Sequence, residues 1–201
     1  MSGSLRRSPH VVYTRTYDAL AHAFVFGDSR VAIMSAAHLD ERSVNQFLAR
    51  HVNWPGALSF LWAEWITLCC LAKAHSAWCH VGFSKKSVVN QDHFGSIDAK
   101  AVKGALKAIE SKSQLPAQRR EVVNRLVRAR VERRIRQGEG AYLVPGEWFA
   151  EYLSNLLSIF FAGFPVGLKD FSVRASVAFV DALDYSGSWA DYYRDRFEAV
   201  I

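Results

Sequence analysis

The feature that most constrains the fold is a long, strongly apolar run over residues 57–78. Its apolar side chains would cover a helical wheel on nearly all sides, which is typical of a helix buried on most of its surface. The charged Glu64 interrupts the run, and we expect it to be ion-paired or partly exposed. The continuous apolar part, residues 57–72 with Glu64 inside it, is too short for a membrane span, so we predict no membrane segment. The side chains expected to fill the core are Leu58, Leu61, Trp62, Trp65, Leu68 and Ala72.

Amphipathic periodicity predicts helices along most of the remaining chain. They are expected over residues 16–26, 39–51, 85–94, 98–115, 147–161 and 173–183, and from residue 189 onward. Residues 30–34 suit either a strand or a helical turn. Because 50% of the residues are apolar, the composition is that of a globular protein. We therefore predict a mainly α fold: a flexible basic tail at 1–10, then a single compact helical domain over 11–201.

The segment 118–144 combines eight arginines with three glutamates. As a helix, it would align two glutamates and three arginines on one face as a ladder of ion pairs, but four other arginines would fall among the valines. As a strand, residues 127–136 alternate apolar and charged side chains, with Arg133 as the single exception. The glycine-rich residues 137–140 would then form a turn. We favour a short helix followed by a small β-hairpin over about 127–144.

Charge is distributed unevenly along the chain. Residues 84–137 carry a net charge of +9, residues 138–201 carry −5 and residues 1–83 carry +2, against +6 for the whole chain. This pattern predicts a basic middle part, residues 57–145, and an acidic helical C-terminal part, residues 146–201. A strongly basic surface is typical of proteins that bind polyanions.

The helix expected over 98–115 places Lys100, Lys103 and Lys107 on the arc opposite its apolar residues. Over residues 57–145 the expected order is a buried helix, a short extended piece, a helix, the helix with this lysine row and an arginine-faced hairpin. That order resembles a winged helix-turn-helix, with an additional basic segment at 113–126. The resemblance implies that the lysines face a nucleic-acid groove and that the wing reaches the backbone. The candidate binding residues are Lys100, Lys103, Lys107, Arg119, Arg120, Arg125, Arg128, Arg130, Arg134 and Arg136.

These features predict a non-enzymatic protein that binds DNA or RNA through a Lys/Arg face. The alternative is a protein-interaction module that docks arginines on a nucleic-acid-processing nucleoprotein complex and inhibits or remodels it, as phage- and plasmid-encoded antagonists do. Arginine and aromatic residues are also enriched at protein interfaces, so composition leaves both open. The acidic C-terminal part could cover the basic face of a second copy and give a homodimer.

Motifs for catalysis or cofactor binding are absent from the sequence. It has no Gly-x-Ser-x-Gly, no P-loop and no dinucleotide-binding glycine pattern, although a nuclease could be assembled from dispersed acidic residues. His75 and Cys79 lack the pairing typical of zinc sites, so we expect a satisfied core histidine, no metal and no cofactor. The three cysteines are expected to be reduced and buried. We expect a cytoplasmic location.

Overall fold

The computed structural model describes residues 18–77, 81, 88–89, 97–161, 168–186 and 189–191. These ranges are mainly helical and contain no β-strand, so the mainly α fold is confirmed. The basic tail and nearly all of the helix expected over 85–94 lie outside them. The principal elements are α1 (Ala19–Phe26), α2 (Ser29–Ala37), α3 (Glu41–Arg50), α4 (Trp54–Leu61), α5 (Ala63–Ala74), α7 (Ala99–Ser111), α8 (Ala117–Arg136), the 3-10 helix η2 (Gly140–Leu143), α9 (Gly146–Phe160) and α10 (Leu168–Asp181).

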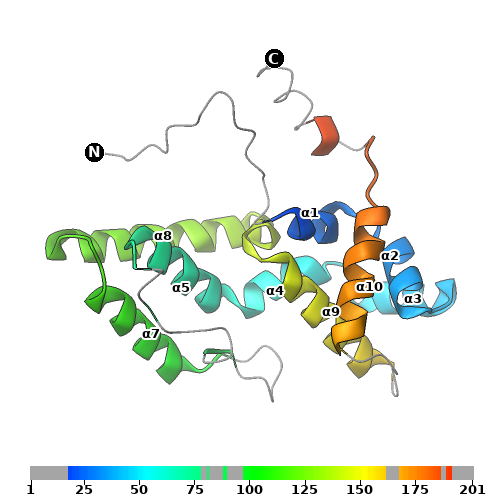
Figure 1. Ribbon diagram of the computed structural model, residues 1–201, viewed down its shortest axis with the longest axis horizontal. Coiled ribbons are helices and arrows are strands. Elements are labelled where there is room, and N and C mark those ends of the chain that lie inside the picture. Colours follow the sequence, from blue (N-terminus) through cyan, green and yellow to red (C-terminus); the bar gives the residue numbers. More distant parts are fainter. Residues whose placement is uncertain are drawn as a thin grey trace.

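The molecule is elongated, and α4 and α5 connect its two ends (Figure 1). At one end α7 and α8 both pack against α5. At the other end α10 packs against α2, and α2 against α3. Helices α1 and α9 lie between these ends, with α9 in contact with α4. The basic helices are therefore carried on an arm that is separate from the α2–α3–α10 end.

The single helix expected over 57–78 is wrong, because the run contains two helices bent by 67° at Trp62. The Asn-Trp-Pro-Gly sequence starts α4: the Asn53 side chain accepts a hydrogen bond from the Gly56 N–H at 3.2 Å, and Pro55 lies in the first turn. The bend lets α4 contact α9 while α5 contacts α7 and α8. Of the expected core residues, Leu61 is instead 42% exposed.

Aromatic rings form the core where α1, α4, α9 and α10 meet. Phe24 lies 4.4 Å from Phe179, 5.7 Å from Phe149 and 6.1 Å from Trp54, measured between ring centroids. All four side chains are at most 2% exposed. Burying each such side chain contributes about 1.5–3 kcal/mol, so this cluster is a principal source of stability.

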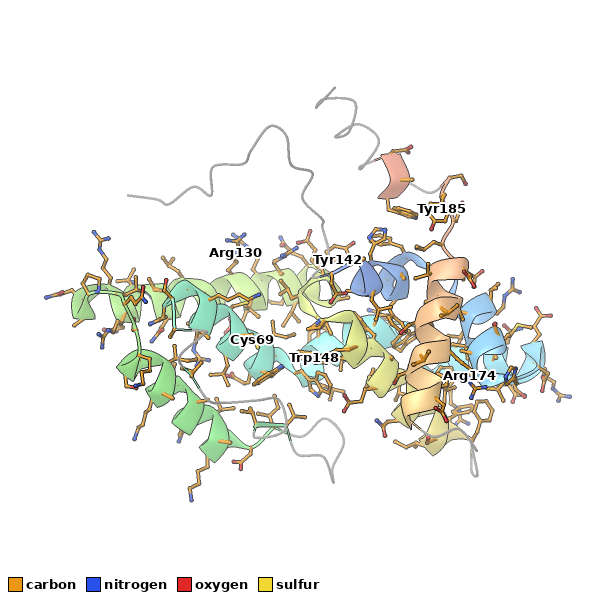
Figure 2. The ribbon with its side chains drawn as sticks, in the orientation of Figure 1. Cys69, Arg130, Tyr142, Trp148, Arg174 and Tyr185 are labelled. Carbon is orange, nitrogen blue, oxygen red and sulfur yellow. The ribbon has the colours of Figure 1, made fainter. Side chains whose placement is uncertain are left out.

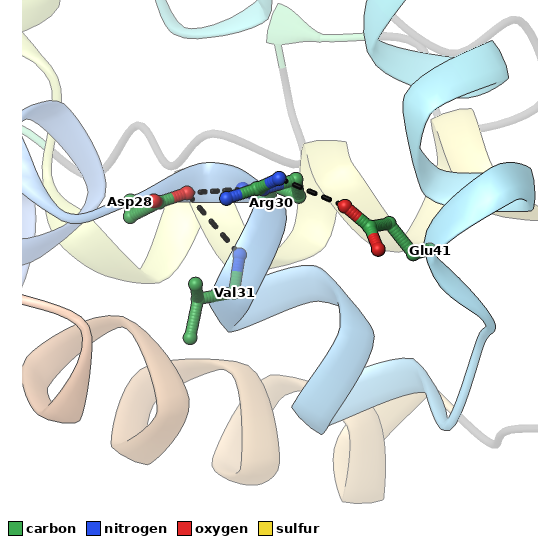
Figure 3. A network of polar contacts seen from close by, with 4 residues as sticks. All are labelled: Asp28, Arg30, Val31 and Glu41. Carbon is green, nitrogen blue, oxygen red and sulfur yellow. Dashed lines mark hydrogen bonds and ion pairs between the residues drawn. The ribbon is translucent and has the colours of Figure 1, made fainter.

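Residues 30–34, for which strand and helix were both open, lie in α2. Asp28 caps this helix: its Oδ1 accepts hydrogen bonds from the N–H groups of Arg30 at 2.9 Å and Val31 at 3.2 Å. The Arg30 guanidinium in turn donates to Glu41 at the start of α3, at 2.9 Å (Figure 3). A capping aspartate therefore settles the local structure, and the arginine beside it ties α2 to α3.

The β-hairpin expected over about 127–144 is wrong, because α8 is helical to residue 136 and η2 follows it. Gly138, at φ +76°, ends α8, and the N–H groups of Gly138 and Glu139 bond back to the last turn of the helix. The strand pattern was misleading because Val127 and Val131 share a face in a helix as well as in a strand. Ala129, which a strand would bury with them, is exposed.

The winged helix-turn-helix is not confirmed, because α8 occupies the place of the wing. Taken singly, none of the helices in the described ranges has both the length and the apolar composition of a membrane span; α4 and α5 reach them only as a bent pair. Half of the residues of that pair, ten of twenty, are buried in the core.

Candidate functional site

The arginine-rich helix α8 packs against α5 along one narrow stripe. Its fully buried side chains are Val131 and Ile135, and the half-buried Val127 and Asn124 continue the same stripe one turn at a time. This spacing of three or four residues is that of a helix face. It leaves more than half of the circumference of α8 turned outward.

Three arginines of α8 are paired with the protein's own carboxylates. Arg128 lies 3.2 Å from Glu64 on α5, Arg134 lies 3.1 Å from Glu139, and Arg136 lies 3.8 Å from Glu132. The expectation that Glu64 is ion-paired or partly exposed is confirmed, since it is both. Of the ladder expected along one face, the Glu132–Arg136 pair forms, whereas Arg128 pairs with Glu64 of α5 instead. A fourth arginine, Arg120, donates from Nε to the Leu115 carbonyl oxygen at 3.1 Å.

Four further arginines form the outer face of α8, which we define as Arg119, Arg125, Arg130 and Arg133. All four are exposed, and none has an ion pair or a hydrogen bond through its side chain within the described residues. Figure 2 shows Arg130 pointing away from α5 at the upper edge of the arm. The sequence-based site omitted Arg133, because the strand pattern assigned it to the buried side. The period of a helix would have identified it.

Apolar side chains lie among these arginines. Leu126 is 62% exposed and Val122 is 44% exposed, and both belong to the outward half of α8. Val122 and Leu126 are therefore neighbours of the outer-face arginines on an exposed surface. No element within the described ranges covers these two side chains.

The lysine row does not join the arginine face. Helix α7 packs on α5 through Val102, Ala105 and Ile109, so its exposed lysines, Lys100, Lys103 and Lys107, are directed away from α5. Helices α7 and α8 lie on different sides of α5 (Figure 1). The ten residues predicted as one site therefore fall on two separate surfaces, with three of the arginines paired internally.

A buried histidine joins the helices that carry these charges. His75, at the end of α5, is fully buried; its Nε2 lies 2.7 Å from Asn124 Oδ1 of α8, and its Nδ1 lies 2.8 Å from Ser113 Oγ. Because an amide oxygen only accepts, Nε2 carries the proton and Ser113 donates to Nδ1. Asn124 also donates to Glu110 of α7 at 2.9 Å. The network fixes α7 and α8 on α5, and the expected satisfied histidine is confirmed.

The thiols beside this arm are poor nucleophiles. Burial raises the pKa of Cys69 to about 12, and burial also raises the pKa of Cys70, although Lys73, Arg130 and Arg134 partly oppose that shift. Both are unpaired thiols and stay protonated near neutral pH. No group of three metal-ligating side chains occurs within the described ranges, and Cys79 lies outside them. What the arm offers chemically is a row of unpaired guanidinium groups.

Comparison of the chain with protein-family models, with curated proteins and with solved structures gives no match.

Proposed function

We propose that this chain is a non-enzymatic protein that binds a polyanion along the outer face of α8, and that the polyanion is DNA or RNA. The observation that carries the proposal is the set of four exposed guanidinium groups without an internal partner. Folding does not use these charges, because within the described residues they form no ion pair with the protein's own carboxylates. An external ligand would supply the acceptors.

The arrangement suits a long, repeating anion better than a small one. At 100° per residue, the four arginines fall within an arc of about 140°, so one surface can meet them all. Arg119 and Arg133 are separated by about 21 Å along the helix axis, which corresponds to roughly six base-pair steps of 3.4 Å. Guanidinium groups bind phosphate through two parallel hydrogen bonds, which favours arginine over lysine for this role.

Salt dependence tests the proposal. Fluorescence anisotropy would measure the affinity of the full chain for a labelled DNA duplex, and for an RNA of the same sequence, at several salt concentrations. Four to five phosphate contacts predict a log–log slope of about −4 for the duplex. Absence of binding at low salt to either nucleic acid, or a flat response to salt, contradicts the proposal.

The second candidate is a protein-interaction module that docks on a nucleic-acid-processing complex. It is favoured by one observation: Val122 and Leu126 are exposed in the middle of the arginine face. A phosphate backbone gains little from aliphatic side chains, whereas the centre of a protein interface buries them.

A double substitution, Val122→Gln with Leu126→Gln, separates the two candidates because it keeps every arginine. Nucleic-acid binding should then be unchanged within about twofold, since the phosphate contacts that dominate its affinity remain. A protein partner that survives nuclease treatment and is lost in this variant would support the second candidate instead.

A further inference from the structure

Helix α10 carries an exposed aliphatic ridge that the fold does not use. Val173, Val177 and Val180 are 62%, 57% and 42% exposed, and their spacing of four and three residues aligns them on one side of the helix. The opposite side holds the buried Phe171, Ala175, Ala178 and Phe179. Scattered exposed valines are ordinary on a protein surface, but an aligned row on an outer helix is typical of a contact surface.

Arg174 and two aspartates, Asp170 and Asp181, flank this ridge on the same side. At 100° per residue, Arg174 and Asp181 lie about 60° and 40° from Val177 in the same direction. They are seven residues apart, about 10 Å along the axis, so they are too distant to pair with each other. Neither makes a side-chain ion pair or hydrogen bond within the part of the chain that the structure describes.

We propose that α10 pairs with α10 of a second copy of this chain, antiparallel, about a twofold axis that passes near Val177. In that register Val177 meets its own equivalent, and Val173 meets Val180 of the second copy. Arg174 meets Asp181 of the second copy, and the reciprocal pair forms at the other end. Measured along the helix axes, the two residues of each pair lie at the same height to within one residue, about 1.5 Å.

The charges around Val177 complement themselves, which points to a second copy of this chain as the partner of α10. A twofold axis perpendicular to the plane of the two helices brings like flanks together, so the flank with Arg174 and Asp181 faces the same flank of the second copy. A homodimer needs one surface that complements itself. Here Arg174 lies three residues before Val177 and Asp181 four residues after it, so each meets its opposite charge on the second copy.

The dimer is expected to be weak and dependent on concentration, because one helix of 14 residues covers less area than the roughly 800 Å² per partner of a standard interface. It is independent of the proposed function: α10 lies at the end of the molecule opposite the α8 arm, as the positions of Arg174 and Arg130 in Figure 2 show. Loss of dimerisation would leave the α8 face intact.

Sedimentation equilibrium of the full chain, over a wide concentration range, tests the proposal. The wild type should show a monomer–dimer equilibrium. Val177→Glu should raise the dimer Kd by at least about tenfold, because two carboxylates would meet on the axis. Val52→Glu, at a valine that is 83% exposed between α3 and α4, is the matched control and should leave the Kd unchanged. Circular dichroism would check that each variant stays folded.

Charge exchange tests the register. Arg174→Asp should weaken the dimer about tenfold, since attraction becomes repulsion at both ends, and adding Asp181→Arg should restore it. A wild type that stays monomeric throughout overturns the proposal. So does a dimer that tolerates Val177→Glu, because it would form through another surface, and so does a double variant as weak as Arg174→Asp alone.

Discussion

Helices α8 and α10 differ both in the side chains that they bury and in those that they expose. The packed face of α10 is made of fully buried aromatic and small side chains such as Phe171, Ala175 and Phe179, and its exposed face is aliphatic. The packed face of α8 has only Val131 and Ile135 fully buried, and its exposed face is cationic.

The difference shows which side chains hold the fold together and which are available for binding. Close aromatic packing stabilises the α10 end, and the Asp28 cap of α2 and the Arg30–Glu41 ion pair support it. The α8 end depends more on hydrogen bonds, chiefly the network of His75, Asn124 and Glu110. The outer face of α8 and the valine ridge of α10 lie outside the core, so we infer from their chemistry what each end binds.

The largest effect is expected from Phe179→Ala at the α10 end. Phe179 is fully buried and lies 4.4 Å from Phe24, ring to ring, so its removal leaves a cavity in the aromatic core. We expect the free energy of unfolding to fall by about 3–5 kcal/mol in chemical denaturation. Val173→Ala, on the exposed side of the same helix, should stay within about 0.5 kcal/mol. Equal losses in the two variants would contradict the assignment of packed and exposed faces.

A smaller loss is expected from Asn124→Ala at the α8 end. The substitution leaves the Nε2–H of the fully buried His75 without its acceptor. A buried donor without a partner costs about 1–3 kcal/mol, and denaturation would measure it. Gln118→Ala, at an exposed position on α8, is the control and should be nearly neutral. An unchanged stability in Asn124→Ala would show that the network does not hold the arm.

The α1 side of the core should be sensitive to acid. Burial lowers the pKa of His22 below 6.5 in the folded protein, and its ring contacts Phe26 at 4.6 Å. Because the unfolded chain then binds the proton more readily, stability should be complete above about pH 6.5 and should decrease as the pH falls below it. Melting temperatures from about pH 7.5 to 5.5 would measure the loss.

The matched variant for this acid sensitivity is His22→Phe, which should reduce the loss. Some loss should remain, because burial, together with the nearby Arg50, also lowers the pKa of His51. A wild type and a variant with the same pH dependence would be inconsistent with the role of His22.

The smallest effect is expected from Glu64→Gln, which removes the partner of Arg128 at the side of α8. This half-exposed pair should contribute about 0.2–1 kcal/mol. Its removal frees a cation near the arginine face, so nucleic-acid binding should tighten slightly. Glu41→Gln removes the partner of Arg30 at the other end and changes the net charge equally. If both variants bind equally well, the position of the freed cation is irrelevant.

The sequence predicted much of the helical fold, because caps and periodicity act locally. The helices expected over 39–51, 98–115 and 147–161 are α3, α7 and α9, and Asp40 and Asp98 cap the first two. Local sequence did not predict the bend at Trp62, where the indole packs against Trp148 from a distant part of the chain. The predicted hairpin was wrong because side chains four residues apart share a face in a helix as well as in a strand.

The sequence did not predict how the candidate residues are distributed over the surface. Four arginines of α8 are exposed without an internal partner among the described residues, yet Arg128 is paired with Glu64, 64 residues away, which no local pattern reveals. The separation of the lysines from the arginines depends on how α7 and α8 are placed around α5. Residue spacing within one helix carries no such information.

The most direct test compares charge removal on the two faces of the arm. One triple variant replaces Arg119, Arg130 and Arg133 with glutamine, and the other replaces Lys100, Lys103 and Lys107 with glutamine, so both lose three charges. We measure the affinity of each for the same duplex at one salt concentration. We expect a loss of at least about tenfold for the arginine variant and a much smaller loss for the lysine variant. Equal losses would contradict it, because binding would then depend on net charge and not on the outer face of α8.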